Sequence, residues 1–333
     1  IPGSGEMEIV RFTWGSSLAD TGHFVLTRIG ARKGLNTQYR VVERAGEGFV
    51  FRGHAILAWK VPIQGHRGSW GTAVYTPYST ALRSPALVAV GKRYLDGVIA
   101  RARARVGTLA SHADSEKYVT DIIPAATTAS IVLIEKIDHG EFLACGGNAA
   151  CVRRIVDAVY VTLAANGPDA SRYAVSHSGA RGFMQFMPGT WTFIRSKYPG
   201  AQLPEFRVGS RDHVASVTAA IALNDYNLTL LDDRHAAWLA ANPKALTMYS
   251  AAAYNGSPKW AIEAIARCGA QWTERSCGWL RRETVVYMDK VEAVWPMVSG
   301  VPATSKSAPP PRTKPSKKSK WRATPLPHRF ARW

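Results

Sequence analysis

Gln185 is the residue whose surroundings first suggest chemistry, because it is a primary amide inside an otherwise apolar run. A buried amide without a hydrogen-bond partner costs about 1–3 kcal/mol, so Gln185 needs either a backbone partner or a ligand. Its neighbours Met184 and Met187 are soft apolar side chains that suit a core or the wall of a groove. Gly182 allows a backbone shape that a side chain would block. Residues 174–191 are therefore a candidate ligand-binding segment.

Three stretches of the chain carry an ordered pattern. Residues 174–191 are similar to AxSxxGAxGLMQxMPxT, with Phe183 in place of the leucine, residues 249–256 are similar to AAYNxG, and residues 283–291 are similar to ETxxYVxKV. Together they resemble the lytic transglycosylases of the soluble-lytic-transglycosylase and goose-lysozyme-like family, which cut bacterial peptidoglycan. The resemblance implies a mainly α-helical, lysozyme-like domain. It also implies a substrate-binding set: Ser176, Met184, Gln185, Tyr254 and Asn255.

Tyr287 corresponds to the tyrosine whose hydroxyl this family aims at its catalytic carboxylate. Three of these site residues also have an ordinary structural interpretation. Gln185 would be a core amide bonded to the backbone, Ser176 would cap a turn or helix, and Tyr287 would be a buried tyrosine bonded elsewhere. Both interpretations remain open at this stage.

The catalytic acid departs from the family pattern, which places a glutamate in an ExS pair shortly before the AxS motif. Gly167 takes that place if the chain is read without a gap, and Ala170 takes it after a short deletion. An upstream acid is the alternative, and Glu135 ends an apolar helical run at 131–135 that is similar to the family's catalytic helix. Apolar neighbours raise the pKa of a carboxyl group, as a general acid at neutral pH requires.

Glu135 would then be separated from the motif by an insertion at residues 142–170. Glu141 is the alternative acid, and Asp169, with a shorter side chain, is the third candidate. Two further interpretations stay open: Glu135 is a solvent-facing glutamate paired with a lysine such as Lys136, or the chain has no catalytic acid at all.

The predicted activity is cleavage of the MurNAc–GlcNAc β-1,4 bond without water, leaving a 1,6-anhydroMurNAc end. One glutamate acts first as acid and then as base, and no metal or cofactor is required. The alternatives are a catalytically silent peptidoglycan-binding or assembly component, and a hydrolytic goose-type lysozyme. In each case the expected partner is the glycan strand of peptidoglycan.

The net charge of +18 is concentrated at the C-terminal end, because residues 301–333 hold nine Lys or Arg and no Asp or Glu. This Pro-rich segment has too few aliphatic residues to form a core, so we expect a disordered tail. Such a tail can bind anionic components of the cell envelope. Nothing else in the chain resembles a nucleic-acid-binding fold, so no nucleic-acid partner is expected.

The four cysteines favour two local disulfides, Cys145–Cys151 and Cys268–Cys277, over a zinc site, because neither spacing matches a zinc knuckle. The alternative is four free thiols. Disulfides predict an oxidising compartment, here the periplasm or cell envelope, or secretion. The chain begins at Ile1 rather than Met, so we expect that an upstream segment, such as a signal or an anchor, preceded it.

The elements that must position these residues divide the chain into three parts. Residues 1–83 are predicted to be a β-rich accessory domain, with strands near 8–14, 23–29, 37–42 and 48–52. Residues 84–300 show helical periodicity and are predicted to form the catalytic domain. The expected helices are 84–106, 124–137, 152–165, 215–231, 243–254 and 281–298. The predicted fold class is therefore α+β.

Overall fold

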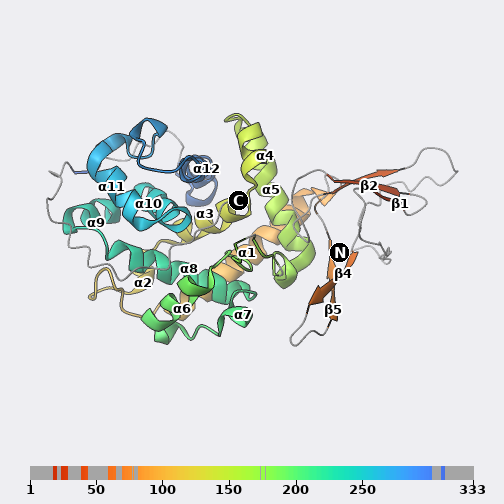
Figure 1. Cartoon of the computed structure of the whole chain (residues 1–333), viewed down its shortest axis with the longest axis horizontal. Helices are drawn as coiled ribbons and strands as arrows, with labels where there is room; N and C mark the ends of the chain where they lie inside the picture. The colour runs from red at the N-terminus through yellow and green to blue at the C-terminus, as the bar shows by residue number, and fades with distance from the viewer. Residues whose placement is uncertain are drawn as a thin grey trace.

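The computed structural model describes the backbone of residues 18–20, 24–28, 39–43, 59–64 and 70–75, together with residues 76, 78, 82–172, 174–176, 178–301 and 309–311. Helices account for most of this part of the chain and gather into one body in Figure 1. Its buried apolar residues run from Leu82 to Trp295.

The helices follow one another along residues 85–299. The α-helices are α1 (Pro85–Val106), α2 (Val119–Ile122), α3 (Ala125–Lys136), α4 (His139–Ala144), α5 (Ala149–Asn166), α6 (Pro188–Lys197), α7 (Phe206–Gly209), α8 (His213–Leu228), α9 (Asp233–Ala240), α10 (Pro243–Asn255), α11 (Pro258–Cys268) and α12 (Arg282–Ser299). Short 3-10 turns are η4 (Gly167–Asp169), η5 (Pro199–Ala201), η6 (Gly269–Gln271) and η7 (Arg275–Cys277).

Within the described residues, five strands precede the helices. They are β1 (Leu18–Asp20), β2 (Phe24–Arg28), β3 (Tyr39–Glu43), β4 (Trp59–Gln64) and β5 (Trp70–Tyr75). They pair antiparallel in two separate sheets, β1-β2-β3 and β4-β5. Figure 1 shows them outside the helical body.

The predicted α+β class is wrong, because no β-rich domain is shown in the described part of the chain and its core is built by helices and the turns between them. Strand propensity depends strongly on context, and a two-stranded ladder has little stability on its own. The predicted strands near 23–29 and 37–42 overlap β2 and β3. Those near 8–14 and 48–52 lie outside the described residues, as does most of the predicted disordered tail.

Helix α1 begins where the sequence predicts. Ser84 caps it, since its Oγ accepts a hydrogen bond of 3.2 Å from the amide of Leu87, and Pro85 occupies the first turn. The helix packs against α5 so closely that a Cβ on Gly91 would lie 1.8 Å from the carbonyl oxygen of Tyr160. The segment expected to be an insertion therefore supplies, in α5, a helix that is integral to the body.

Helix α3 lies at the centre of the body and packs against α1, α5, α8, α10 and α12 (Figure 1). Its residues Ile131 to Ile134 are all at most 1% exposed, which leaves little freedom for the last turn that follows them. The predicted helices at 124–137, 215–231, 243–254 and 281–298 are confirmed as α3, α8, α10 and α12, with ends shifted by at most three residues.

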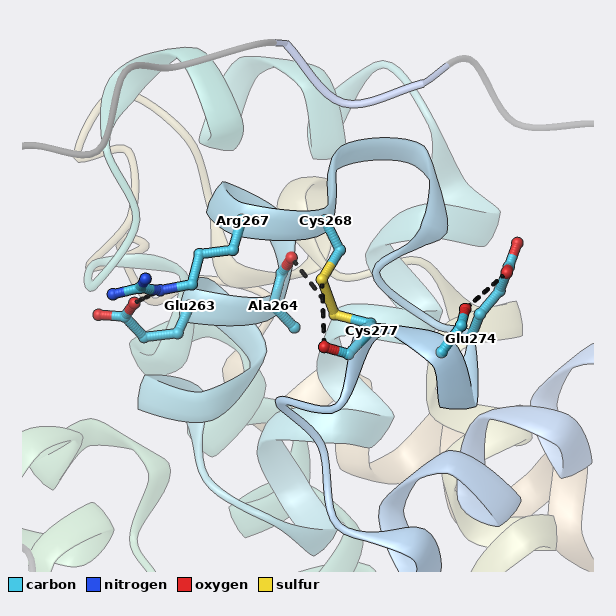
Figure 2. Close-up of a disulfide and its surroundings, with 7 residues drawn as sticks. Glu263, Ala264, Arg267, Cys268, Glu274 and Cys277 are labelled. Atoms are coloured by element: carbon cyan, nitrogen blue, oxygen red, sulfur yellow. Dashed lines mark hydrogen bonds and ion pairs between the residues drawn. A yellow bond between two sulfur atoms is a disulfide. The ribbon is translucent and has the colours of Figure 1, made fainter.

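Both predicted disulfides are present, Cys145–Cys151 with Cα atoms 5.5 Å apart and Cys268–Cys277 with Cα atoms 5.7 Å apart. Figure 2 shows the second bridge fastening the end of α11 to η7, with the Glu263–Arg267 ion pair on the same helix. The expected helices leave residues 255–280 without a helix, so α11 was missed. Among the described residues, no helix is long and apolar enough to cross a membrane.

Candidate active site

The centre of the candidate site is a hydrogen bond between Tyr287 and Glu135. Glu135 is half-buried in the last turn of α3, and Tyr287 projects from the second turn of α12. The Tyr287 hydroxyl donates to Oε1 of Glu135 across 152 residues of sequence. The contact expected from the family resemblance is therefore present in the structure.

Burial raises the pKa of the Glu135 carboxyl group above its ordinary value. The hydrogen bond from Tyr287 and the positive charges of Lys136 and Lys290 oppose this rise without cancelling it. Burial, followed by the charge of Glu135, also raises the pKa of the Tyr287 phenol, so it stays a neutral donor. This pairing suits proton transfer, because the carboxyl keeps its proton to a higher pH than an exposed glutamate does.

Tyr254 connects α10 to the candidate ligand-binding segment. Its buried hydroxyl donates a hydrogen bond of 2.7 Å to the main-chain carbonyl of Met184. Burial raises the pKa of Tyr254, and the charge of Glu135 raises it further, which places this phenol within the electrostatic reach of the carboxylate. The Met184 side chain is fully buried, so it packs in the core while its carbonyl receives Tyr254.

The segment around Gln185 is a tight turn. Arg181 and Phe186 exchange main-chain hydrogen bonds of 3.0 and 3.1 Å, and Gln185 has a φ of +50°. A non-glycine residue in this left-handed region is uncommon, and such residues cluster at functional sites. The Gln185 amide Nε2 donates to the carbonyl of Gly182 at 2.8 Å, so it has the backbone partner of the structural interpretation.

Gly182 is required where it stands. Its φ is +72°, and a Cβ at this position would lie 1.6 Å from the carbonyl oxygen of Ser210. The glycine therefore lets the turn rest directly on the loop before α8. Ser176 serves the same segment as a turn cap, since its Oγ accepts from the amide of Ala180 at 3.0 Å.

Asn255 joins α10 to α12 at the other side of the site. Its Oδ1 accepts a hydrogen bond of 2.9 Å from Thr284 Oγ1, one turn before Tyr287. A Cβ on Gly256 would lie 2.9 Å from the same Thr284 oxygen, so the two helices meet closely here. The Met184–Tyr254 and Asn255–Thr284 hydrogen bonds thus join the three sequence motifs, and Tyr287–Glu135 connects them to the candidate acid.

The other candidate acids lie elsewhere. Glu141 is in the first turn of α4, where its main-chain amide donates a hydrogen bond of 2.9 Å to Oδ1 of Asp138, the residue that caps the helix. The charge of Glu141 acts on the phenol of Tyr78. Asp169 lies in η4 and pairs with Arg172 at 3.1 Å. Among the described residues, no cluster of three or more His, Cys, Asp or Glu side chains is arranged to hold a metal ion.

Two polar residues next to these elements were missed by the sequence reasoning. Lys290 is 2% exposed on α12, and its position three residues after Tyr287 in the third motif was the available signal. His213, the first residue of α8, stacks on Phe183 with ring centroids 3.9 Å apart and bonds the carbonyl of Ala170 at 2.7 Å. No sequence signal indicates these two contacts, because His213 lies 30 positions after Phe183 and 43 positions after Ala170.

Comparisons of the chain with protein-family models, with characterised proteins and with solved structures find no match. The function is therefore argued from the site itself and from the resemblance of its three motifs.

Proposed function

We propose that this protein is a peptidoglycan lytic transglycosylase in which Glu135 is the single catalytic acid and base. The observation that carries the proposal is the Tyr287–Glu135 hydrogen bond at a carboxyl group whose pKa is raised by burial. It is supported by the hydrogen bonds that bring the three motif segments to the same place.

In the proposed reaction, protonated Glu135 gives its proton to the glycosidic oxygen as the bond from this oxygen to the MurNAc anomeric carbon breaks. The MurNAc 6-hydroxyl then attacks the anomeric carbon, and its proton passes to the Glu135 carboxylate. The products are a free GlcNAc 4-hydroxyl and a 1,6-anhydroMurNAc end, and Glu135 returns to its starting form.

One carboxyl group suffices for this reaction because the nucleophile belongs to the substrate. Hydrolytic glycosidases pair two carboxyl groups about 5–9.5 Å apart, one of which acts as nucleophile or activates water. Tyr287 orients one oxygen of Glu135 and leaves the other to exchange the proton. The two disulfides agree with the proposed periplasmic, cell-envelope or secreted location.

The test is digestion of purified sacculi followed by mass analysis of the products. The wild-type protein is expected to release muropeptides with anhydro ends, each one water lighter than a hydrolytic product. Glu135→Gln should reduce the rate by about 10²–10⁴-fold, because it removes the transferable proton. Glu141→Gln is the matched control and should retain activity.

Hydrolytic products would identify the goose-type lysozyme alternative. The absence of any product, with binding to sacculi retained, would identify the silent binding component that the missing ExS glutamate suggests. Loss of activity in Glu141→Gln but not in Glu135→Gln would transfer the catalytic role to Glu141.

A further inference from the structure

Lys290 is a buried cation at the end of the helix that carries Glu135. Its side chain is 2% exposed, and its Nζ donates to the carbonyl of Ile137 at 2.7 Å and, less closely, to that of Ile134 at 3.4 Å. A lysine is almost never buried without partners, because its charge loses the solvation of water. The last carbonyls of a helix carry partial negative charge and lack partners within the helix. The C-terminal end of α3 therefore compensates the buried ammonium.

The two carbonyls that Lys290 contacts flank the proposed acid, one residue before Glu135 and two residues after it. The same Nζ lies 5.0 Å from the centroid of the Tyr287 ring, within the range of a cation–π contact. One ammonium group thus contacts the backbone that carries the carboxylate and the ring that donates to it.

We propose that Lys290 is a positioning residue for Glu135, holding the last turn of α3 so that the carboxyl group stays aligned with the Tyr287 hydroxyl. This inference rests on the proposed function of Glu135. The alternative role for Lys290 is global stability alone, which would require only that the buried charge be compensated somewhere in the core.

The charge of Lys290 adds a second, measurable effect. The groups that shift the pKa of Glu135 are Tyr287 and Lys290 from α12 and Lys136 from α3 itself, and the charge of Glu135 in turn acts on Tyr254 from α10. The positive charges of Lys290 and Lys136 both lower the pKa of Glu135 against the rise caused by burial. Loss of the Lys290 charge should therefore move this pKa further upward.

Lys290→Met removes both the donors and the charge, whereas Lys290→Gln keeps a donor without the charge. Local order is read from hydrogen exchange at the amide of Ile137, which donates to the carbonyl of Leu133 at 3.0 Å. The Glu135 pKa is read by carbon-13 NMR titration of labelled glutamate. Glu292→Gln is the matched control, since Glu292 lies on α12 with Lys290 and the substitution removes its 2.5 Å ion pair with Lys244 of α10.

In Lys290→Met we expect exchange at Ile137 to accelerate by about tenfold or more relative to α1 and α5, because charge-assisted hydrogen bonds are lost. The Glu135 pKa should rise, because the positive charge of Lys290 that lowers it is lost. kcat on soluble glycan should fall about tenfold with little change in KM. Lys290→Gln should show the same pKa rise with smaller changes in exchange and kcat, and Glu292→Gln should show none of these changes.

Unchanged exchange at Ile137 and an unchanged Glu135 pKa would overturn the positioning role, as would exchange that accelerates equally throughout the helical body. If Lys290→Met does not fold, Lys290→Gln decides between these outcomes. Exchange and titration need no turnover, so they test the inference even if the wild-type protein releases no product. That last result would reject the proposed function and leave the contact between Lys290 and α3 to be judged by exchange alone.

Discussion

Removing the Tyr287 hydroxyl is the most direct test of how Glu135 is held. In Tyr287→Phe the ring remains in α12, and only the hydrogen bond to Glu135 Oε1 is lost. A hydrogen bond that involves a charged group contributes about 1.5–3 kcal/mol. At 1.36 kcal/mol per factor of ten, the loss of transition-state alignment corresponds to a decrease of about ten- to a hundredfold in kcat/KM.

The pH dependence gives the same substitution a second readout. The Tyr287 hydrogen bond lowers the pKa of Glu135, so its loss should raise that pKa. In the proposed reaction Glu135 must be protonated when it acts as acid, so activity should fall as the pH rises through its pKa. In Tyr287→Phe this alkaline fall should move to higher pH while the maximal rate decreases.

The assay is the initial rate of anhydro-muropeptide release from soluble glycan strands, measured by mass spectrometry across a pH series. Tyr249→Phe is the matched control, because Tyr249 is fully buried and its hydroxyl donates a hydrogen bond of 2.7 Å to the main-chain carbonyl of Asn227, away from Glu135. Both variants lose one buried hydroxyl, but only Tyr287→Phe should lose activity per folded molecule. Equal rates and equal pH profiles for Tyr287→Phe and the wild-type protein would refute the reasoning.

Three further predictions concern stability and the tail. Because burial raises the pKa of Glu135, ionisation of this carboxyl group destabilises the folded state as the pH rises above the ordinary pKa of glutamate. Glu135→Gln should therefore have a higher Tm than the wild-type protein at neutral pH and lose this advantage near pH 4. Equal Tm values at pH 7 would contradict the prediction. Burial lowers the pKa of His213 to about 4, so its neutral form contributes about 3 kcal/mol that is fully present above pH 6.5 and is lost as the pH falls from 6.5 to 4. The free energy of unfolding, measured with denaturant at a series of pH values, should depend less on pH in His213→Gln than in the wild-type protein. An unaltered pH dependence would count against this role of His213. Deleting residues 312–333 removes eight positive charges, and this should weaken binding to sacculi at low salt. In 1 M salt, where the Debye length is about 3 Å, the two forms should bind equally, and turnover of soluble glycan should be retained. Equal binding of both forms at low salt would be inconsistent with this prediction.

The sequence predicts local structure well where a helix-capping residue or a helical repeat of apolar residues marks it. Ser84 and Pro85 mark the start of α1, and the third motif marks α12. Helix α11 was missed although Pro258 occupies its first turn as Pro85 does in α1, because the cysteine pair favoured a loop; the helix is specified by apolar residues such as Ala261 and Ile265 that face the body. The β-rich domain was wrongly predicted because propensity alone does not show whether strands enclose a core.

The candidate site was predictable only as far as the motifs extend. Glu135 and Tyr287 were expected to meet because the family resemblance connects them, not because any local pattern does. The burial of Lys290 and the stacking of His213 on Phe183 are tertiary facts, since a lysine or histidine on a helix is usually solvated. The Nε2 partner of Gln185, in contrast, lies three residues away and was among the expected interpretations.

The place of α12 at the end of the helical region has a consequence for biosynthesis. This helix supplies Thr284, Tyr287 and Lys290, while Glu135 belongs to a helix completed about 150 residues earlier. Contacts between segments so distant in sequence can form only after the intervening chain has been made. A nascent or prematurely terminated chain that lacks α12 therefore carries the carboxylate without the phenol that aligns it. The proposed activity therefore requires that α12 has been made and has docked on the earlier helices, which confines it to molecules synthesised at least as far as Ser299.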